Sequence, residues 1–182
     1  MKIFKSFFDN KVKIYKSNIF SDARGFFTEQ YNIKKLAKIN IKEKFVQDNF
    51  VFSSKKNTFR GIHLQKKPFQ QSKIIYVISG EILDVVVDLR KNSKTFGKYK
   101  LIKLNDKNRL QIYIPKNFGH AYLTLKNNTI VNYKVSNYYS PNQSICISYL
   151  DPMINLQLSI KKIILSKNDK NGLFIKDIMD KL

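Results

Sequence analysis

The sequence of 182 residues has little of what disulfides, membrane spans and signal peptides require. It contains a single cysteine, Cys146, so a disulfide within the chain is excluded and a reduced, cytoplasmic setting fits best. No apolar run approaches the ~20 residues that cross a membrane. Residues 1–6 lack the apolar stretch of a signal peptide. We therefore expect neither a membrane partner nor secretion.

Acidic residues are also scarce. The chain has 13 of them and 34 lysines and arginines, which gives a formal net charge of +21. Such a charge attracts nucleic acids, anionic membrane surfaces or phosphorylated small molecules. The lysines, however, are scattered singly or in pairs, with no basic tail and no arginine-rich helix. We interpret most of the charge as a solvated lysine surface and expect no nucleic-acid partner. A basic nucleic-acid-binding module without catalysis remains the rival class.

Short runs of strand-forming residues are plentiful, and they recur every ~8–12 residues between turn signals. This pattern is typical of an all-β sandwich or barrel, and the length suits one domain over residues 1–182. In residues 81–89 the alternation places Asp84 on the same face as Ile82 and Val86, so we expect a barrel interior that is not wholly apolar. The expected strands are 74–79, 82–89, 99–104, 110–114, 122–125, 129–136 and 144–150.

Two short peripheral helices are expected outside the strands. Asn32 is a suitable N-cap for a helix over residues 33–39. From about residue 173 onward, Phe174, Ile178 and Leu182 repeat at the i, i+4, i+8 spacing of a helix.

Histidine is the scarce residue that says most about function, because the chain has only His63 and His120. An imidazole both takes and gives protons near neutral pH. His63 ends the segment Arg60-Gly61-Ile62-His63, and His120 follows a proline and a glycine, as at a turn into a strand. A hydrogen-bonded core histidine is the alternative for His63. Further polar residues complete a set that suggests an enolisation site with an anion clamp: Arg60, Lys73, Asp84, Tyr133, Tyr138, Tyr139 and Asp169.

Lys73 begins an apolar strand, where a charge needs either a partner or a function; a lysine at the barrel rim is the alternative. Tyr133 shares a strand face with two valines, so it is expected to point inward, either as a reactive group or as an ordinary core tyrosine. Tyr138 and Tyr139 form an aromatic pair at a turn, suited to stacking on a base or to capping the barrel.

A catalytic metal is not expected from these residues. Small β-barrels that hold one use two or three histidines with a carboxylate, whereas here Gln65 occupies the second position after His63. The sequence also lacks the glycine-rich dinucleotide motif, the P-loop and a nucleophile elbow. We therefore expect no cofactor.

Motifs spread over nearly the whole chain carry a resemblance to one family. In order they are Asp22-Ala23-Arg24-Gly25-Phe26-Phe27-Thr28-Glu29, Phe45-Val46-Gln47-Asp48-Asn49, Arg60-Gly61-Ile62-His63, Gln71-Ser72-Lys73, Gly80-Glu81, Asp84, Val87-Asp88-Leu89-Arg90-Lys91, Thr95-Phe96-Gly97, Ile114-Pro115, His120, Tyr133, Tyr138-Tyr139-Ser140-Pro141, Asp151-Pro152 and Leu165-Ser166-Lys167-Asn168-Asp169. Together they resemble the dTDP-4-dehydrorhamnose 3,5-epimerase family. The resemblance implies a cupin-type jelly-roll barrel and a homodimer that exchanges its N-terminal strands. It also implies cofactor-independent epimerisation of a nucleotide-diphosphate sugar, namely conversion of dTDP-4-dehydro-6-deoxy-D-glucose to dTDP-4-dehydro-L-rhamnose.

The resemblance also implies a role for each matching residue. His63 would be the base that removes the proton next to the C4 ketone, with Asp169 fixing its tautomer, and Tyr133 would return a proton on the opposite face. Lys73 would stabilise the enolate, supported by His120 and Asp84. The residues implied to hold the nucleotide diphosphate are Gln47, Asn49, Arg60, Tyr138 and Tyr139. Those implied to come from the second subunit are Arg24, Phe27 and Glu29.

The chain departs from the family pattern at two places. Tyr76 stands where the family commonly has arginine, and residues 155–159 replace a common Gly-Ile-x-Trp-Pro stretch. Relatives act on other 4-keto sugars, including GDP-linked heptoses, or invert C3 alone. Epimerisation of another dTDP- or GDP-linked 4-keto sugar, at C3 alone or at C3 and C5, is therefore the alternative within this class.

Overall fold

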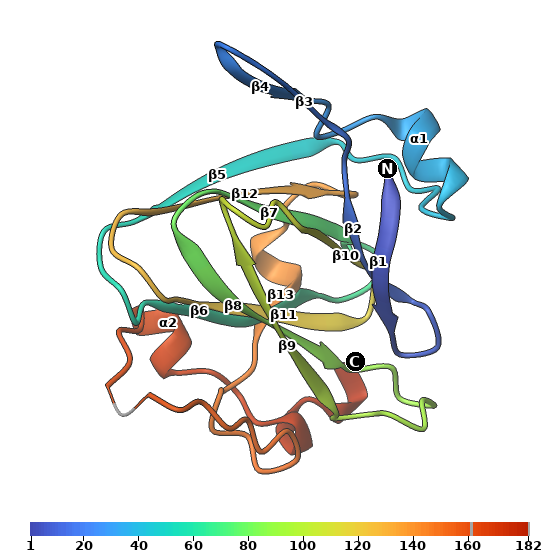
Figure 1. Cartoon of the computed structure of the whole chain (residues 1–182). Helices are drawn as coiled ribbons and strands as arrows, with labels where there is room; N and C mark the ends of the chain where they lie inside the picture. The colour runs from blue at the N-terminus through green and yellow to red at the C-terminus, as the bar shows by residue number, and fades with distance from the viewer. Residues whose placement is uncertain (161, 182) are drawn as a thin grey trace.

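The computed structural model describes residues 1–160 and 162–181. Two antiparallel sheets pack face to face into a barrel, and a separate hairpin projects from one end (Figure 1). The six-stranded sheet has the order β1 (Lys2–Phe7), β2 (Val12–Lys16), β10 (Gln111–Ile114), β7 (Lys73–Ser79), β12 (Thr129–Val135), β5 (Gln47–Ser53). The five-stranded sheet has the order β13 (Ser144–Cys146), β6 (Phe59–Gln65), β11 (Phe118–Thr124), β8 (Glu81–Asp88), β9 (Tyr99–Asn105). The hairpin consists of β3 (Ile19–Asp22) and β4 (Gly25–Thr28).

Neighbouring strands in both sheets are mostly distant in the sequence. Strand β10 lies between β2 and β7, and β11 lies between β6 and β8. Such crossing connections between two packed antiparallel sheets define a jelly roll. The all-β class and the cupin-type jelly-roll barrel predicted from the sequence are confirmed.

The main core fills the space between the two sheets. Ile75, Ile112 and Val131 of the six-stranded sheet pack against residues such as Val86 and Leu104 of the five-stranded sheet. Fully burying one such aliphatic side chain stabilises the fold by ~1.5–3 kcal/mol. This packing holds the two sheets at a fixed separation, so side chains from both can meet in one cavity.

Strand β8 shows the alternation that the sequence predicted. Ile82 and Val86 lie in the core between the sheets, whereas Val85 and Val87 pack against the C-terminal segment on the other face. Asp84 shares the inner face and is fully buried. The barrel interior is therefore partly polar, as expected.

The first expected helix is confirmed as α1 (Ile33–Lys38). The side chain of Asn32 accepts a hydrogen bond of 3.0 Å from the backbone N–H of Lys35, as an N-cap does. Leu36 is the buried residue of α1 and packs near Tyr15 on the outer face of the six-stranded sheet.

The expected C-terminal helix over residues 174–182 is wrong. The chain forms two short 3₁₀ turns instead, at Ile175–Asp177 and Met179–Lys181. Ile175 and Ile178 are buried under the five-stranded sheet, and their three-residue spacing matches the three residues per turn of a 3₁₀ helix. The carboxylate of Asp151 fixes the first turn by accepting a 2.6 Å hydrogen bond from the N–H of Ile175. Leu182 lies outside the described residues.

The expected strand over residues 144–150 is shorter than predicted, because β13 ends at Cys146. Ile147 still exchanges backbone hydrogen bonds with Ile62, but the N–H of Ser148 donates to the carbonyl of Leu173. The chain thus turns away from the sheet edge and crosses toward the C-terminal segment. A further helix that the sequence analysis did not expect, α2 (Lys167–Lys170), follows and reaches the cavity.

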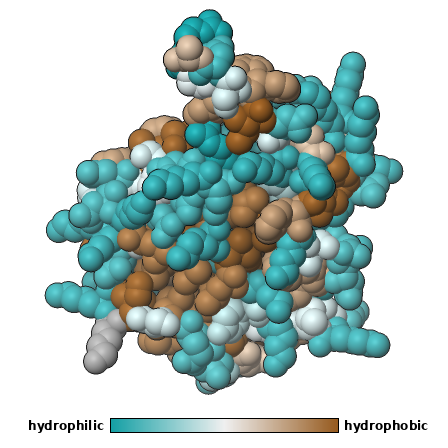
Figure 2. Space-filling model, viewed as in Figure 1, coloured by the Kyte–Doolittle hydropathy of each residue, from teal (hydrophilic) through white to brown (hydrophobic). Residues whose placement is uncertain are grey.

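Most lysines are exposed, as the sequence predicted. Figure 2 shows hydrophilic side chains spread over this face of the barrel, with apolar atoms between them. Among the described residues, no helix is both long and apolar enough to cross a membrane.

Candidate active site

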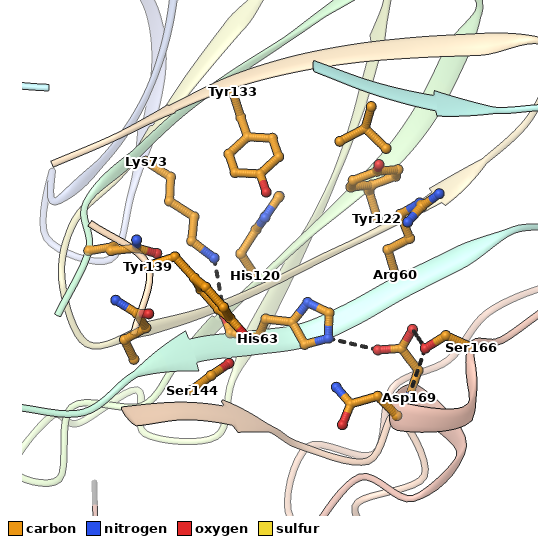
Figure 3. Close-up of a pocket in the computed structure, with 14 residues that line it drawn as sticks. Arg60, His63, Lys73, His120, Tyr122, Tyr133, Tyr139, Ser144, Ser166 and Asp169 are labelled. Atoms are coloured by element: carbon orange, nitrogen blue, oxygen red, sulfur yellow. Dashed lines mark hydrogen bonds and ion pairs between the residues drawn. The ribbon is translucent and has the colours of Figure 1, made fainter. Parts of the chain in front are cut away.

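A cavity of about 290 Å³ lies between the two sheets, close to α2 (Figure 3). It brings together the two histidines with the lysine and the inward-facing tyrosine that the sequence singled out. The residues that line it are Val51, Arg60, His63, Gln65, Gln71, Lys73, His120, Tyr122, Tyr133, Tyr139, Ser144, Ser166, Asn168 and Asp169.

His63 and Asp169 form a hydrogen-bonded pair at the wall of this cavity. Nε2 of His63 lies 2.7 Å from Oδ1 of Asp169. The Asp169 carboxylate also accepts hydrogen bonds from the hydroxyl of Ser166 (2.7 Å) and the N–H of Gly61 (3.3 Å). Burial opposes ionisation of Asp169, but these hydrogen bonds outweigh it and lower its pKa. An ionised Asp169 keeps the proton of His63 on Nε2 and leaves Nδ1 with a free lone pair.

The N-cap of helix α2 fixes the position of Asp169. Ser166 is the N-cap of α2, and its hydroxyl accepts a 3.1 Å hydrogen bond from the N–H of Asp169. The same hydroxyl donates to the Asp169 carboxylate. The spacing Ser-x-x-Asp is the usual signature of such a cap, so it could have been read from the sequence.

An irregularity in β6 puts Arg60 and His63 on the same side of the sheet. In a regular strand, residues three apart face opposite sides. Here His120 pairs with His63 and Tyr122 pairs with Arg60, so β6 carries one extra residue between these pairs. Gly61 permits this bulge: its φ is +121°, and a Cβ there would lie 2.6 Å from the Cβ of Ala121.

A second histidine–aspartate pair lies deeper in the barrel. Nε2 of His120 is 2.8 Å from Oδ2 of Asp84, and both side chains are buried. Burial lowers the pKa of His120, although Asp84 opposes this effect. The deep position favours a neutral imidazole at His120.

Lys73 reaches the cavity beside the deep pair. Its ammonium donates a 3.3 Å hydrogen bond to the backbone carbonyl of His63. Burial lowers the pKa of Lys73 to about 8, with the charge of Asp84 acting in the opposite direction. Lys73 is thus a buried cation that faces the cavity rather than a rim lysine.

Tyr133 approaches the cavity from the other sheet. It lies on β12, while His63 lies on β6, and Figure 3 shows the two side chains entering from opposite sides. Burial raises the pKa of Tyr133, so its hydroxyl keeps its proton near neutral pH. The cavity therefore holds a free imidazole nitrogen on one side and a phenolic proton donor on the other.

The residues expected to hold a nucleotide gather near one edge of the cavity. Gln47 donates a 2.8 Å hydrogen bond to the side chain of Asn49 and accepts one of 3.3 Å from the N–H of Tyr139. Arg60 donates to Ser53 at 3.3 Å. Tyr139 lines the cavity, whereas Tyr138 is exposed and does not. Gln47 and Asn49 lie beside the cavity rather than on its lining.

Arg24, Phe27 and Glu29 do not reach the cavity of their own chain. Arg24 lies at the tip of the projecting hairpin and pairs with Asp22, and Phe27 is 67% exposed (Figure 1). Glu29 binds Lys35 and Asn32 at the start of α1. The structure of a single chain therefore leaves these three residues apart from the others.

Several lining residues were missed by the sequence analysis. Tyr122 is two residues after His120 on β11, and strand periodicity could have placed it on the same face. The other missed residues are Val51, Gln65 and Gln71, with Ser144, Ser166 and Asn168.

One group of side chains could hold a divalent metal. The donor atoms of His63, Cys146 and Asp169 all lie within 4.8 Å of one another. The ligands expected from the sequence were histidines and carboxylates, and Cys146 was not among them. Burial, and then the nearby Asp169, raise the pKa of the Cys146 thiol to about 12, so a metal would have to displace its proton. That the chain needs no metal stays a prediction.

An imidazole–carboxylate pair on the cavity wall, a buried cation and a phenol around one cavity in a jelly roll suit carbohydrate epimerases that work through an enolate. The comparisons with known proteins agree. The sequence matches the family model described as dTDP-4-dehydrorhamnose 3,5-epimerase over residues 10–177. A relative of that name from Shigella flexneri is 38% identical over 162 residues, which cover 88% of this chain and 89% of the relative.

Solved structures of the same kind superpose closely. That of dTDP-4-dehydrorhamnose 3,5-epimerase from Bacillus anthracis, with TDP and PPi bound, has a TM-score of 0.92 and 39% identity, covering 95% of this chain and 98% of that one. The epimerase from Legionella pneumophila, in complex with dTDP-4-keto-L-rhamnose, has a TM-score of 0.90 and 34% identity, covering 96% and 93%. The chain belongs to the dTDP-4-dehydrorhamnose 3,5-epimerase family, and it is an isomerase.

Proposed function

We propose that the chain converts dTDP-4-dehydro-6-deoxy-D-glucose to dTDP-4-dehydro-L-rhamnose by inverting C3 and C5 without a cofactor. The observation that carries this proposal is the placement of His63 and Tyr133 on opposite sides of one cavity. Inversion next to a ketone needs a base on one face of the sugar and an acid on the other. The relatives named above supply the identity of the sugar nucleotide.

In the first half of each inversion, Nδ1 of His63 takes the proton from the carbon next to the C4 ketone. The electron pair of the broken C–H bond moves into the ring and leaves the negative charge on the C4 oxygen. Asp169 holds His63 in the tautomer that can accept this proton. Lys73 stabilises the enolate oxygen, and Asp84 supports the charged form of Lys73 against burial.

In the second half, the hydroxyl of Tyr133 donates a proton to the same carbon from the opposite face. The electron pair returns from the C4 oxygen to form the new C–H bond, so the ketone is restored. Tyr133 then regains its proton, and His63 loses the one it took, by exchange with solvent. The sequence runs once at C3 and once at C5, and no redox change occurs.

We propose that Arg60 and Tyr139 bind the nucleotide diphosphate, with Gln47, Asn49 and Tyr138 at the base end. Arg60 is a cation on the cavity wall, and guanidinium groups bind phosphate through paired hydrogen bonds. Tyr139 is 60% exposed and offers an aromatic face to a base. The hydrogen bonds among Gln47, Asn49 and the backbone of Tyr139 hold these groups together.

We also propose that the active unit is a homodimer in which the hairpin of one subunit completes the cavity of the other. The hairpin projects from the end of its own barrel, which it touches where the guanidinium of Arg109 stacks on Phe26, and Phe20, Phe26 and Phe27 are all exposed. Phe50 and Phe52 on the adjoining strand β5 are exposed as well. Apolar side chains exposed together are typical of a surface that another chain covers. The single cysteine and a nucleotide-sugar substrate favour a cytoplasmic location.

Incorporation of deuterium from the solvent into the sugar tests the reaction. The purified chain is incubated in D₂O with dTDP-4-dehydro-6-deoxy-D-glucose, and deuterium at C3 and C5 is followed by NMR and mass spectrometry. We expect incorporation at both positions together with the inverted product. No incorporation with dTDP- or GDP-linked 4-keto sugars, alongside salt-dependent RNA binding, would establish the nucleic-acid-binding module instead.

A further inference from the structure

The hydroxyl of Tyr122 is a buried polar group without a partner. Tyr122 lies on β11 and lines the cavity, and it is only 4% exposed. Among the described residues, no hydrogen bond of ordinary geometry reaches its hydroxyl, although the side chain of Ser53 lies near enough to oppose, as a minor effect, the rise in its pKa. Its strand neighbour Arg60 stands beside it on the same wall (Figure 3). Burial raises the pKa of Tyr122 to about 12, so the hydroxyl keeps its proton and can act as a donor.

Such a group weakens the fold of the free protein. A buried hydroxyl that loses its water and gains no protein partner costs free energy, and the apolar equivalent of the same shape does not. Phenylalanine would fill the same space in the core between the sheets, where Tyr122 packs with Val86 and Phe118. The hydroxyl therefore has hydrogen-bonding capacity that the free chain leaves unused and that a ligand in the cavity can take up.

We propose that the Tyr122 hydroxyl donates a hydrogen bond to an oxygen of the bound substrate, next to the group that Arg60 binds. This makes Tyr122 a substrate-binding residue in addition to those already proposed, and the inference rests on the proposed function. The oxygen acceptor belongs either to the phosphate attached to the sugar or to a sugar hydroxyl. Binding of free dTDP distinguishes the two acceptors, because dTDP has the phosphates but lacks the sugar that is attached to them in the substrate.

The Tyr122→Phe variant tests the proposal, because it should make the free protein more stable and the binding of substrate weaker. The Tm of the free variant should rise by ~2–4 °C, because the unsatisfied hydroxyl is gone. The KM for the dTDP-linked sugar should rise about tenfold, which corresponds to ~1.4 kcal/mol, because a hydrogen bond to the substrate is lost. Calorimetry with dTDP locates the contact: weaker dTDP binding assigns it to the phosphate, and unchanged dTDP binding with a raised KM assigns it to the sugar.

Tyr15→Phe is the matched control. Tyr15 is also fully buried, but its hydroxyl bonds Oε1 of Gln111 at 3.3 Å and lies outside the cavity. We expect this variant to lower the Tm and to leave the KM unchanged, which is the opposite pattern.

The proposal is overturned if Tyr122→Phe leaves the KM and the dTDP affinity unchanged, or if it lowers the Tm as Tyr15→Phe does. Failure of the proposed function looks different, because the unmodified chain itself would then neither bind dTDP nor turn over the dTDP-linked sugar.

Discussion

Oδ1 of Asp169 lies 2.7 Å from Nε2 of His63, although 106 residues separate them in the sequence. The carboxylate holds the imidazole in the tautomer whose Nδ1 can take a proton. Asp169→Asn keeps the shape of the side chain but removes its charge, so we expect kcat to fall by about 10²-fold or more. Steady-state kinetics measure this loss. Unchanged kcat in Asp169→Asn would show that the carboxylate does not support the base.

The acid and the base can be separated by their isotope behaviour. His63→Ala should abolish both deuterium exchange and turnover, since it removes the base on that side of the cavity. Tyr133→Phe should slow inversion more than exchange, since abstraction by His63 stays possible without the donor opposite. Both rates are followed by NMR in D₂O on the same samples. Near-normal rates in His63→Ala would move the role of base to His120.

Lys73 gives the reaction a pH dependence with a definite sign. Its pKa is lowered to about 8 by burial, so it is charged below that pH and loses its charge as the pH rises through it. The rate should therefore fall above about pH 8. Tyr133 does not cause this decline, because its pKa is raised. In Lys73→Arg the remaining activity should persist to higher pH, since guanidinium stays protonated. An identical alkaline decline in Lys73→Arg would exclude Lys73 as its source.

The sequence predicted the parts of this site that depend on local pattern. Alternation in β8 was enough to place Asp84 inside the barrel, and the alternation around Tyr133 was enough to point it inward. The shared face of Arg60 and His63 could not be predicted, because it depends on a bulge that appears only when β6 pairs with β11. The C-terminal turns likewise depend on contacts distant in sequence, with Asp151 and with the face of the five-stranded sheet.

Metals should be dispensable for turnover, yet zinc should inhibit. Treatment with EDTA is expected to leave the rate unchanged, because the proposed steps use side chains only. Added Zn²⁺ can bind His63, Asp169 and Cys146, whose Sγ lies 3.6 Å from Oδ1 of Asp169, about the spacing of two ligands on one zinc ion. Cys146→Ser removes the thiolate ligand, so the inhibitory Zn²⁺ concentration should rise about tenfold while basal activity stays close to normal. Loss of activity in EDTA, restored by metal, would refute cofactor independence.

Subunit mixing tests whether the hairpin serves a neighbouring cavity. A chain with Arg24→Ala and Phe27→Ala lacks its hairpin contacts, and a chain with His63→Ala lacks its base; each alone should be nearly inactive. In a mixed dimer, the cavity with intact His63 receives the intact hairpin of the other subunit and becomes complete. After the two variants are unfolded together and refolded in equal amounts, roughly one quarter of normal activity should return, because half the dimers are mixed and each has one complete site.

The control for this experiment mixes His63→Ala with Asp169→Asn. Both residues meet in one cavity of a single chain, so the mixed dimer contains no site in which they are intact together. No activity beyond the sum of the two variants is expected. If the hairpin variant also fails to gain activity with His63→Ala, although sedimentation shows mixed dimers, then the hairpin does not complete the cavity of its partner. Recovery in the hairpin mixture alone would place Arg24 and Phe27 in the active site of the other subunit.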